Sequence, residues 1–254
     1  MVNLSALDRI KMQVFWDRLI AIVEEQAQVL MKTAFSNVVR EAGDLSAGVF
    51  NPSGEMLAQA ITGTPGHVNA MAQSVRHFLD RFPAEEMSSG DVFVTNDPWL
   101  GTGHLHDFTV VTPVFRDRKV IAFFASTCHV LDIGGLGFGP DGHEVFEEGL
   151  NIPIMHFAHK GELNHAMFNI LRANVRAPLS VEGDLHSLAA SNERGCRLLL
   201  QLMDEHRLTT LDMIGDWILA RSRDAMLAEI RRLEPASYRH KMLVEDYASS
   251  MLLA

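Results

Sequence analysis

Short strand-like runs fill the middle of the chain, and long stretches with helical periodicity lie on both sides of them. Each run is rich in apolar residues and is bounded by Gly, Pro, Asn or Asp, which favour turns. The runs cover 46–50, 55–60, 90–95, 108–115 and 120–127. The first two are separated by Asn51-Pro52-Ser53-Gly54, and the last two by the charged turn 116–119, so both pairs are predicted hairpins.

Apolar positions spaced three or four residues apart indicate the helices. We expect helices over 5–39, 66–82, 162–173, 181–206 and 209–233. The glycine-rich stretch 134–149 has little periodicity, so it is expected to be a long functional loop. The pattern therefore predicts an α+β fold with a strand-rich centre and long flanking helices.

Composition excludes several classes of protein. The 254 residues are 47% hydrophobic and carry 22 Lys and Arg against 32 Asp and Glu, a formal charge of -10, which disfavours a nucleic-acid partner. The sequence has no apolar run near the roughly 20 residues that a membrane span needs, so no membrane partner is expected. Two cysteines cannot form a disulfide framework. We expect a cytoplasmic protein.

Histidines crowd into the central region. Six of the 12 lie between residues 104 and 159. His104 and Asp107 follow a loop of glycines and a proline, and His129 and Asp132 repeat the His-x-x-Asp spacing at the end of the next predicted strand. Imidazole and carboxylate groups suit zinc, manganese or iron, so the two strand ends could share one ion.

The spacing alone leaves other readings open. A histidine near a strand end is more often a hydrogen-bonded residue than a ligand, and Asp44 by itself is typical of an Asx-turn before a hairpin. Cys128 adjoins His129 on a strand, where neighbouring side chains point to opposite faces, so Cys128 is expected to be buried rather than nucleophilic. The glycines of 134–142 open no phosphate-binding helix, so no nucleotide site is predicted.

Five blocks of the sequence form a distinctive series along nearly the whole chain. They cover 65–71, 90–104, 129–135, 147–153 and 181–185. The most specific contains Asn96-Asp97-Pro98 and runs on to His104. In this order the blocks closely resemble the hydantoinase B/oxoprolinase family.

The resemblance implies a metal-binding enzyme subunit. In that family the companion A-type subunit binds ATP and phosphorylates the substrate, so ATP is not expected to bind to this chain. The family pattern assigns the metal ligands to Asp44, His104, Asp107 and His129, with Asp132 as runner-up ligand or supporting carboxylate. These four ligands are also the expected catalytic residues. The ion is expected to be Zn, Mn or Fe.

The expected activity is ATP-dependent ring opening of a cyclic amide such as a hydantoin, a lactam or 5-oxoproline. The chain is expected to act in a hetero-oligomer with the ATP-binding subunit. One alternative is a subunit of an ATP-dependent ketone carboxylase of the acetone or acetophenone type. Another is an inactive, truncated assembly partner. Family members run to twice this length or more, so the chain is expected to be one domain over 1–254, cut short or continued on another polypeptide. His106 replaces a residue common in the family and is either a fifth ligand or a surface group.

Overall fold

The computed structural model describes residues 5–137, 139, 141–244 and 251–253. The chain divides into two compact units, Met1–Ile218 and Leu219–Ala254. Phe138 and Pro140 of the expected loop lie outside the described residues. The expected single domain over 1–254 stays a prediction.

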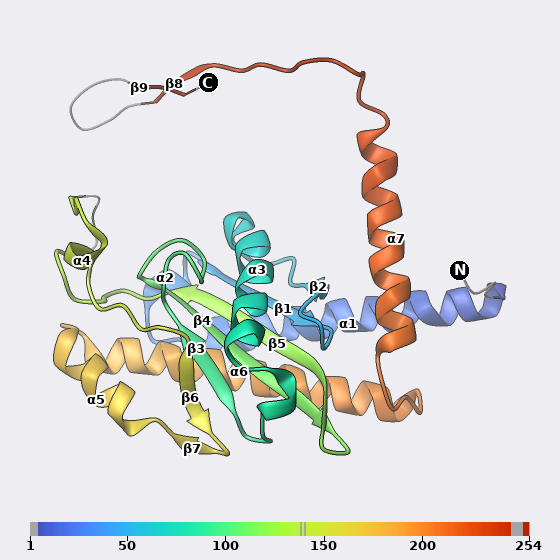
Figure 1. Ribbon diagram of the computed structural model, residues 1–254, viewed down its shortest axis with the longest axis horizontal. Helices are drawn as coiled ribbons and strands as arrows, with labels where there is room; N and C mark the ends of the chain where they lie inside the picture. Colours follow the sequence, from blue (N-terminus) through green and yellow to red (C-terminus); the bar gives the residue numbers. More distant parts are fainter. Residues whose placement is uncertain (1–4, 138, 140, 245–250, 254) are drawn as a thin grey trace. The chain divides into compact units, whose positions relative to one another are not determined.

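The first unit is built on a seven-stranded antiparallel sheet (Figure 1), with strand order β2-β1-β5-β4-β3-β6-β7. The strands are β1 (Leu45–Phe50), β2 (Met56–Gln59), β3 (Val92–Thr95), β4 (Asp107–Arg116), β5 (Lys119–His129), β6 (Met155–His159) and β7 (Glu162–Leu163). The helices are α1 (Ala6–Thr33), α2 (Asn37–Arg40), α3 (Pro65–Arg81), α4 (Val145–Glu148), α5 (His165–Asn174), α6 (Pro178–Glu205) and α7 (Asp212–Ile230), with a 3-10 turn at Ala84–Glu86. In the second unit, β8 (Met242–Val244) pairs with β9 (Met251–Leu253). The α+β prediction is confirmed.

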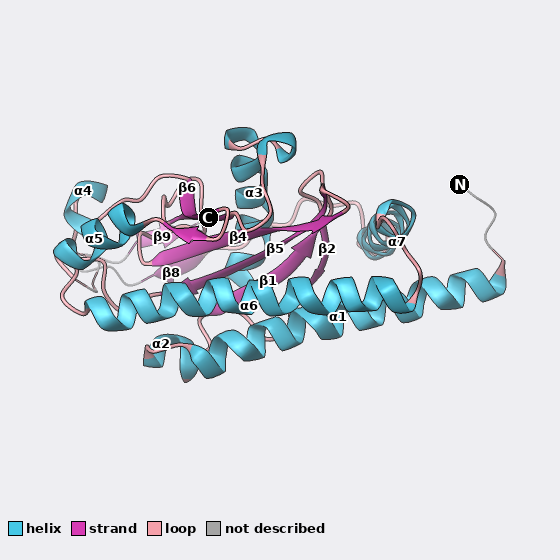
Figure 2. Ribbon diagram, turned by 90° about the horizontal axis from the view of Figure 1, so that it is seen from below, coloured by secondary structure: helices cyan, strands magenta, loops and turns pink. Residues whose placement is uncertain are grey.

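Helices cover both faces of the seven-stranded sheet. Figure 2 shows α1 and α6 running side by side along one face, with α3 on the other. Leu30, Phe108 and Leu185 belong to the core on the α1/α6 side. Phe78 and Phe123 belong to the core under α3. Among the described helices, none is long and apolar enough to span a bilayer.

The expected helix over 5–39 is wrong in its last part. α1 ends at Thr33 and a separate turn of helix, α2, follows. Between them, Oδ1 of the buried Asp184 accepts the N–H groups of Phe35 at 2.7 Å and Ser36 at 3.1 Å. A carboxylate from α6 thus satisfies the backbone donors where the helix breaks.

The expected helix over 162–173 begins too early, and sequence patterning missed the four strands β6 to β9. Glu162–Leu163 forms β7, which pairs with β6 through a turn at Lys160 and Gly161, both with positive φ. The helix α5 starts only after Asn164, whose side chain accepts the N–H of Met167 at 3.1 Å. Asn164 is therefore an N-cap that separates strand from helix.

A buried polar bridge joins the helix layer to the sheet. Nε2 of Gln26 on α1 donates to the carbonyl of Ala125 at 3.0 Å and to Oδ1 of Asn192 at 2.7 Å. Nδ2 of Asn192 on α6 donates to the carbonyl of Val110 at 3.0 Å. Both amides are fully buried. Because buried polar groups are costly unless paired, the bridge fixes how α1 and α6 lie over β4 and β5.

We predict that Asn192→Ala lowers the free energy of unfolding by about 2–4 kcal/mol, because it removes two buried hydrogen bonds, one from Gln26 and one to the Val110 carbonyl. Chemical denaturation of the full chain measures this change. The control is Asn169→Ala, at an exposed position of α5, which is expected to change the value by less than about 0.5 kcal/mol. Equal effects of both substitutions would contradict the prediction.

Asp132 fastens the start of the long loop to the segment before α6. Its Oδ1 accepts the N–H of Gly134 at 3.0 Å, and its Oδ2 accepts the N–H of Ala177 at 2.9 Å and that of Arg176. The Arg176 guanidinium lies 3.2 Å from Oδ1. Burial raises the pKa of Asp132, but these donors outweigh burial, and the pKa lies below its ordinary value.

Because the folded state lowers the pKa of Asp132, its carboxylate stabilises the fold above its unfolded pKa, and this contribution is lost as the pH falls through the folded pKa. We therefore expect Asp132→Asn to lower the free energy of unfolding by about 2 kcal/mol at pH 7 and by less below about pH 4. Urea unfolding at both pH values measures the difference. The exposed Asp80→Asn is the control, and a penalty for Asp132→Asn that does not shrink in acid would refute the prediction.

Candidate metal centre

Three adjacent strands bring the predicted ligands to one edge of the sheet. Asp107 is the first residue of β4 and pairs in register with His129, the last residue of β5. Asp44 directly precedes β1, and its backbone carbonyl accepts the N–H of His129 at 3.2 Å. His104 lies in the loop that leads into β4. Antiparallel pairing therefore collects residues that are far apart in the sequence.

Asp107 is the centre of the cluster. Its Oδ1 lies 2.8 Å from Nδ1 of His129, and its Oδ2 lies 3.1 Å from Nδ1 of His104. One ligand atom from each of the three residues lies within 4.8 Å of the others. Asp107 is fully buried, whereas the His104 side chain is 68% exposed. The cluster is thus anchored in the protein and open to solvent on the side of His104.

Asp44 joins this cluster through His67, a residue that the sequence analysis did not single out as a ligand. Nε2 of His67 lies 3.5 Å from Oδ2 of Asp107 and 3.7 Å from Oδ1 of Asp44. The Thr64 hydroxyl donates to Oδ1 of Asp44 at 2.7 Å. The sequence signal that could have identified His67 is the Pro65-Gly66-His67 block, because a proline that starts a helix places His67 in the first turn of that helix.

Asp107 and the buried His67 shift each other's ionisation. Burial raises the pKa of Asp107, but hydrogen bonds with His129 and His67 outweigh burial and hold the pKa well below its ordinary value. Burial lowers the pKa of His67, yet its hydrogen bond with Asp107 and the charges of Asp107 and Asp44 raise it overall. The surroundings therefore favour the ionised form of Asp107 and the protonated form of His67 more than water does.

Two further residues of the sequence analysis lie beside the centre. His106 is buried, not a surface group, and its ring stacks on that of His129 with centroids 5.0 Å apart. Burial and the nearby His129 lower its pKa. Its role as a fifth ligand stays a prediction. So does the ligand role of Asp132, whose two oxygens accept the backbone donors described above.

The Asn96-Asp97-Pro98 block holds the loop that carries His104. Nδ2 of Asn96 donates to the carbonyl of Leu105 at 2.6 Å and to that of Leu150 at 2.9 Å, and its Oδ1 accepts the N–H of Ile152 at 2.6 Å. Gly101 is required here, because a Cβ at this position would lie 2.8 Å from the carbonyl oxygen of Asp97. The buried amide of Asn96 thus links the ligand loop to the segment that leads into β6.

The donor set fits a divalent ion. Around zinc, ligands about 2.0–2.1 Å from the metal in tetrahedral geometry lie about 3.3 Å from one another. The distances of 2.8 and 3.1 Å from Asp107 to the two imidazoles are close to this spacing. Two imidazoles with one or two carboxylates are a ligand set that zinc, manganese and iron accept.

A hollow of about 220 Å³ adjoins the ligand loop. It lies between α3 and the segment 98–103, and Gln73, Ser74, Thr102 and Gly103 are among its lining residues. Gly103 directly precedes His104, so the hollow borders the loop that carries this candidate ligand. Its wall carries amide and hydroxyl groups that can bind a polar ligand.

Three comparisons relate the chain to known proteins. It is 30% identical to 5-oxoprolinase 1 of Arabidopsis thaliana, over 87% of this chain and 19% of that protein. It is 30% identical to the caprolactamase subunit beta of Pseudomonas jessenii, over 80% of this chain and 35% of that protein. The crystal structure of that ATP-dependent caprolactamase matches with a TM-score of 0.85 and 27% identity, over 95% of this chain and 42% of that chain.

An acetone carboxylase structure shares the fold alone, with a TM-score of 0.73 and 22% identity over 83% of this chain and 28% of that chain. The chain spans less than half the length of each of these proteins. A family model described as hydantoinase B/oxoprolinase matches residues 8–253. The chain therefore belongs to the hydantoinase B/oxoprolinase family.

Proposed function

We propose that this chain is the metal-holding part of an ATP-dependent enzyme that opens a cyclic amide. The convergence of His104, Asp107 and His129 at the solvent-facing edge of the sheet carries this proposal. The names of its relatives, a 5-oxoprolinase and an ATP-dependent caprolactamase, support the substrate class. A hydantoin, a lactam or 5-oxoproline fits the proposal.

His104, Asp107 and His129 would hold the ion, with Asp44 as the fourth ligand. A divalent ion in such a place supplies a Lewis acid that stabilises negative charge on a substrate oxygen and lowers the pKa of water. Nε2 of His67 lies between the carboxylates of Asp44 and Asp107, where a proton on this nitrogen would orient both. The stacked His106 fixes the plane of the His129 ring.

The proposed partner is an A-type subunit that binds ATP and phosphorylates the amide oxygen. An unactivated amide is a poor electrophile, whereas a phosphorylated oxygen is a good leaving group. In this proposal the present chain binds the ion through its exposed cluster of ligands, and the partner subunit binds the nucleotide. A relative named as a subunit supports a hetero-oligomer.

A second candidate is a subunit of an ATP-dependent ketone carboxylase. The fold shared with acetone carboxylase favours it, because the same sheet and helices could present an ion to a phosphorylated ketone. The two candidates differ in their co-substrate. Lactam-stimulated ATP hydrolysis with a ring-opened product supports the hydrolase, and a bicarbonate-dependent carboxylated product supports the carboxylase.

We predict that Asp107→Asn or His129→Ala, in the complex with the ATP-binding subunit, removes one equivalent of bound metal and lowers ring opening by roughly 100-fold or more, since even indirect metal partners cost 10–100-fold. Metal analysis and product chromatography with caprolactam, 5-oxoproline and hydantoin as substrates measure the two effects. Circular dichroism shows whether each variant is folded.

His165→Asn is the matched control, because this exposed histidine begins α5, outside the cluster. It is expected to keep both metal and turnover. Full turnover of folded Asp107→Asn, or of metal-free protein, would overturn the proposal. A complex that assembles but holds no ion at these residues and opens no ring would favour the inactive assembly partner.

A further inference from the structure

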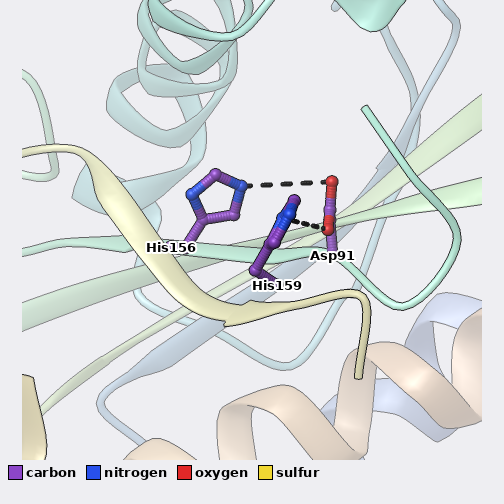
Figure 3. Close-up of side chains that lie close together, drawn as sticks. All are labelled: Asp91, His156 and His159. Carbon is purple, nitrogen blue, oxygen red and sulfur yellow. Dashed lines mark ion pairs between the residues drawn. The ribbon is translucent and has the colours of Figure 1, made fainter. Parts of the chain in front are cut away.

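A second cluster of metal-ligating side chains lies outside the centre described above. Asp91 directly precedes β3, and His156 and His159 lie on β6. Nδ1 of His159 is 3.0 Å from Oδ1 of Asp91, and Nε2 of His156 is 4.0 Å from Oδ2 (Figure 3). One ligand atom from each of the three lies within 4.8 Å of the others.

A β-bulge brings the two histidines to one face. Residues three apart on a regular strand point to opposite faces. In the pairing of β3 with β6, Val92 faces Ala158 but Phe93 faces His156, so Phe157 is an extra residue. The bulge reverses the alternation between His156 and His159, whose ring centroids lie 4.7 Å apart. Bulges commonly re-aim side chains in this way.

The backbone fixes Asp91 in place. Its Oδ2 accepts the N–H of Ser88 at 2.7 Å and its Oδ1 accepts the N–H of Lys160 at 2.8 Å. The turn at Gly90 packs against Gly161 so closely that a Cβ on Gly90 would lie 2.7 Å from the Gly161 nitrogen. The carboxylate is buried, yet each oxygen can accept more than one bond, so both can still face an ion.

The histidines are positioned for binding from the solvent side. The ring of His156 lies 4.8 Å from those of both Phe82 and Phe93, which hold its plane. The His159 side chain is 53% exposed, which leaves a path for an ion from solution.

We propose that Asp91, His156 and His159 form a second metal site that binds a divalent transition-metal ion such as Zn²⁺. Two imidazoles and one carboxylate are a common ligand set for such ions, with the remaining position open to water. His159 lies 3.0 Å from one oxygen of Asp91 and His156 lies 4.0 Å from the other, whereas ligand atoms around zinc lie about 3.3 Å apart. Small side-chain rotations would therefore bring one atom of each residue within bonding distance of a zinc ion. The ion would tie the β6–β7 hairpin to the start of β3.

The second site cannot share the ion of the first. Asp91 precedes β3, whereas the far end of β3, Thr95, pairs with Thr109 beside Asp107. A strand of this length spans about 13 Å, far beyond the reach of one ion. Each site can therefore be lost without removing the ligands of the other.

The test is a Zn²⁺ titration of the chelator-treated full chain, with bound metal counted after dialysis. We expect His159→Asn and His156→Asn each to bind one equivalent less than the unaltered chain. Zn²⁺ is also expected to raise the melting temperature less in these variants. His165→Asn is the control and is expected to keep the unaltered stoichiometry.

Asp91→Asn is a weaker variant, because Asp91 also accepts two backbone N–H groups and its loss could unfold the turn. The histidine variants keep that turn. An anomalous X-ray signal at the zinc edge between the three side chains would support the proposal directly. Unchanged stoichiometry in folded His156→Asn and His159→Asn would overturn it and leave a hydrogen-bonded cluster only. The Asp107→Asn variant is expected to keep this second equivalent, so the two proposals can fail separately.

Discussion

The pairing of Asp107 with His129 is the interaction on which the centre depends. A fully buried carboxylate is costly unless nearby donors compensate it, and here His129, His104 and His67 surround it. The compensation requires the register in which the first residue of β4 faces the last residue of β5. A slip of one residue would turn His129 to the opposite face of the sheet and leave the carboxylate buried without it.

Several features of the fold hold that register. The β4–β5 hairpin closes through Asp117 and Arg118, both with positive φ, in a two-residue turn whose twist suits a hairpin. Near this turn a bulge between Val114 and Phe115 shifts the pairing by one residue. Farther along the strands, Asn192 and Gln26 bind the carbonyls of Val110 and Ala125 from the helix layer. The turn, the bulge and the amide bridge together fix the register in which Asp107 faces His129 at the far end of the hairpin.

The sequence predicted what local patterns encode. The long helices, the two hairpins and the α+β class follow from periodicity and turn residues. The His-x-x-Asp spacing indicated that His104, Asp107 and His129 lie near the ends of neighbouring strands, and the structure brings these three residues together. The sequence analysis missed what distant residues decide. α1 breaks because Asp184, on α6, binds the backbone at Phe35 and Ser36. β7 has only two residues, and β6 is short and carries His156 and His159 instead of an alternating pattern. His67 reaches the centre only because α3 packs on the sheet.

The placement of the two histidine clusters follows from the geometry of β3. Its end at Thr95 leads into the Asn96 loop, whose hydrogen bonds to Leu105 and Ile152 shape the approach to the first centre. Its start at Val92, directly after Asp91, pairs with the bulged β6 near the edge of the sheet. An ion at the start of β3 would stiffen the same strand that carries the Asn96 loop. Because a packed strand transmits displacement along its length better than a free loop does, an ion held by Asp91, His156 and His159 would steady the Asn96 loop from the other end of β3.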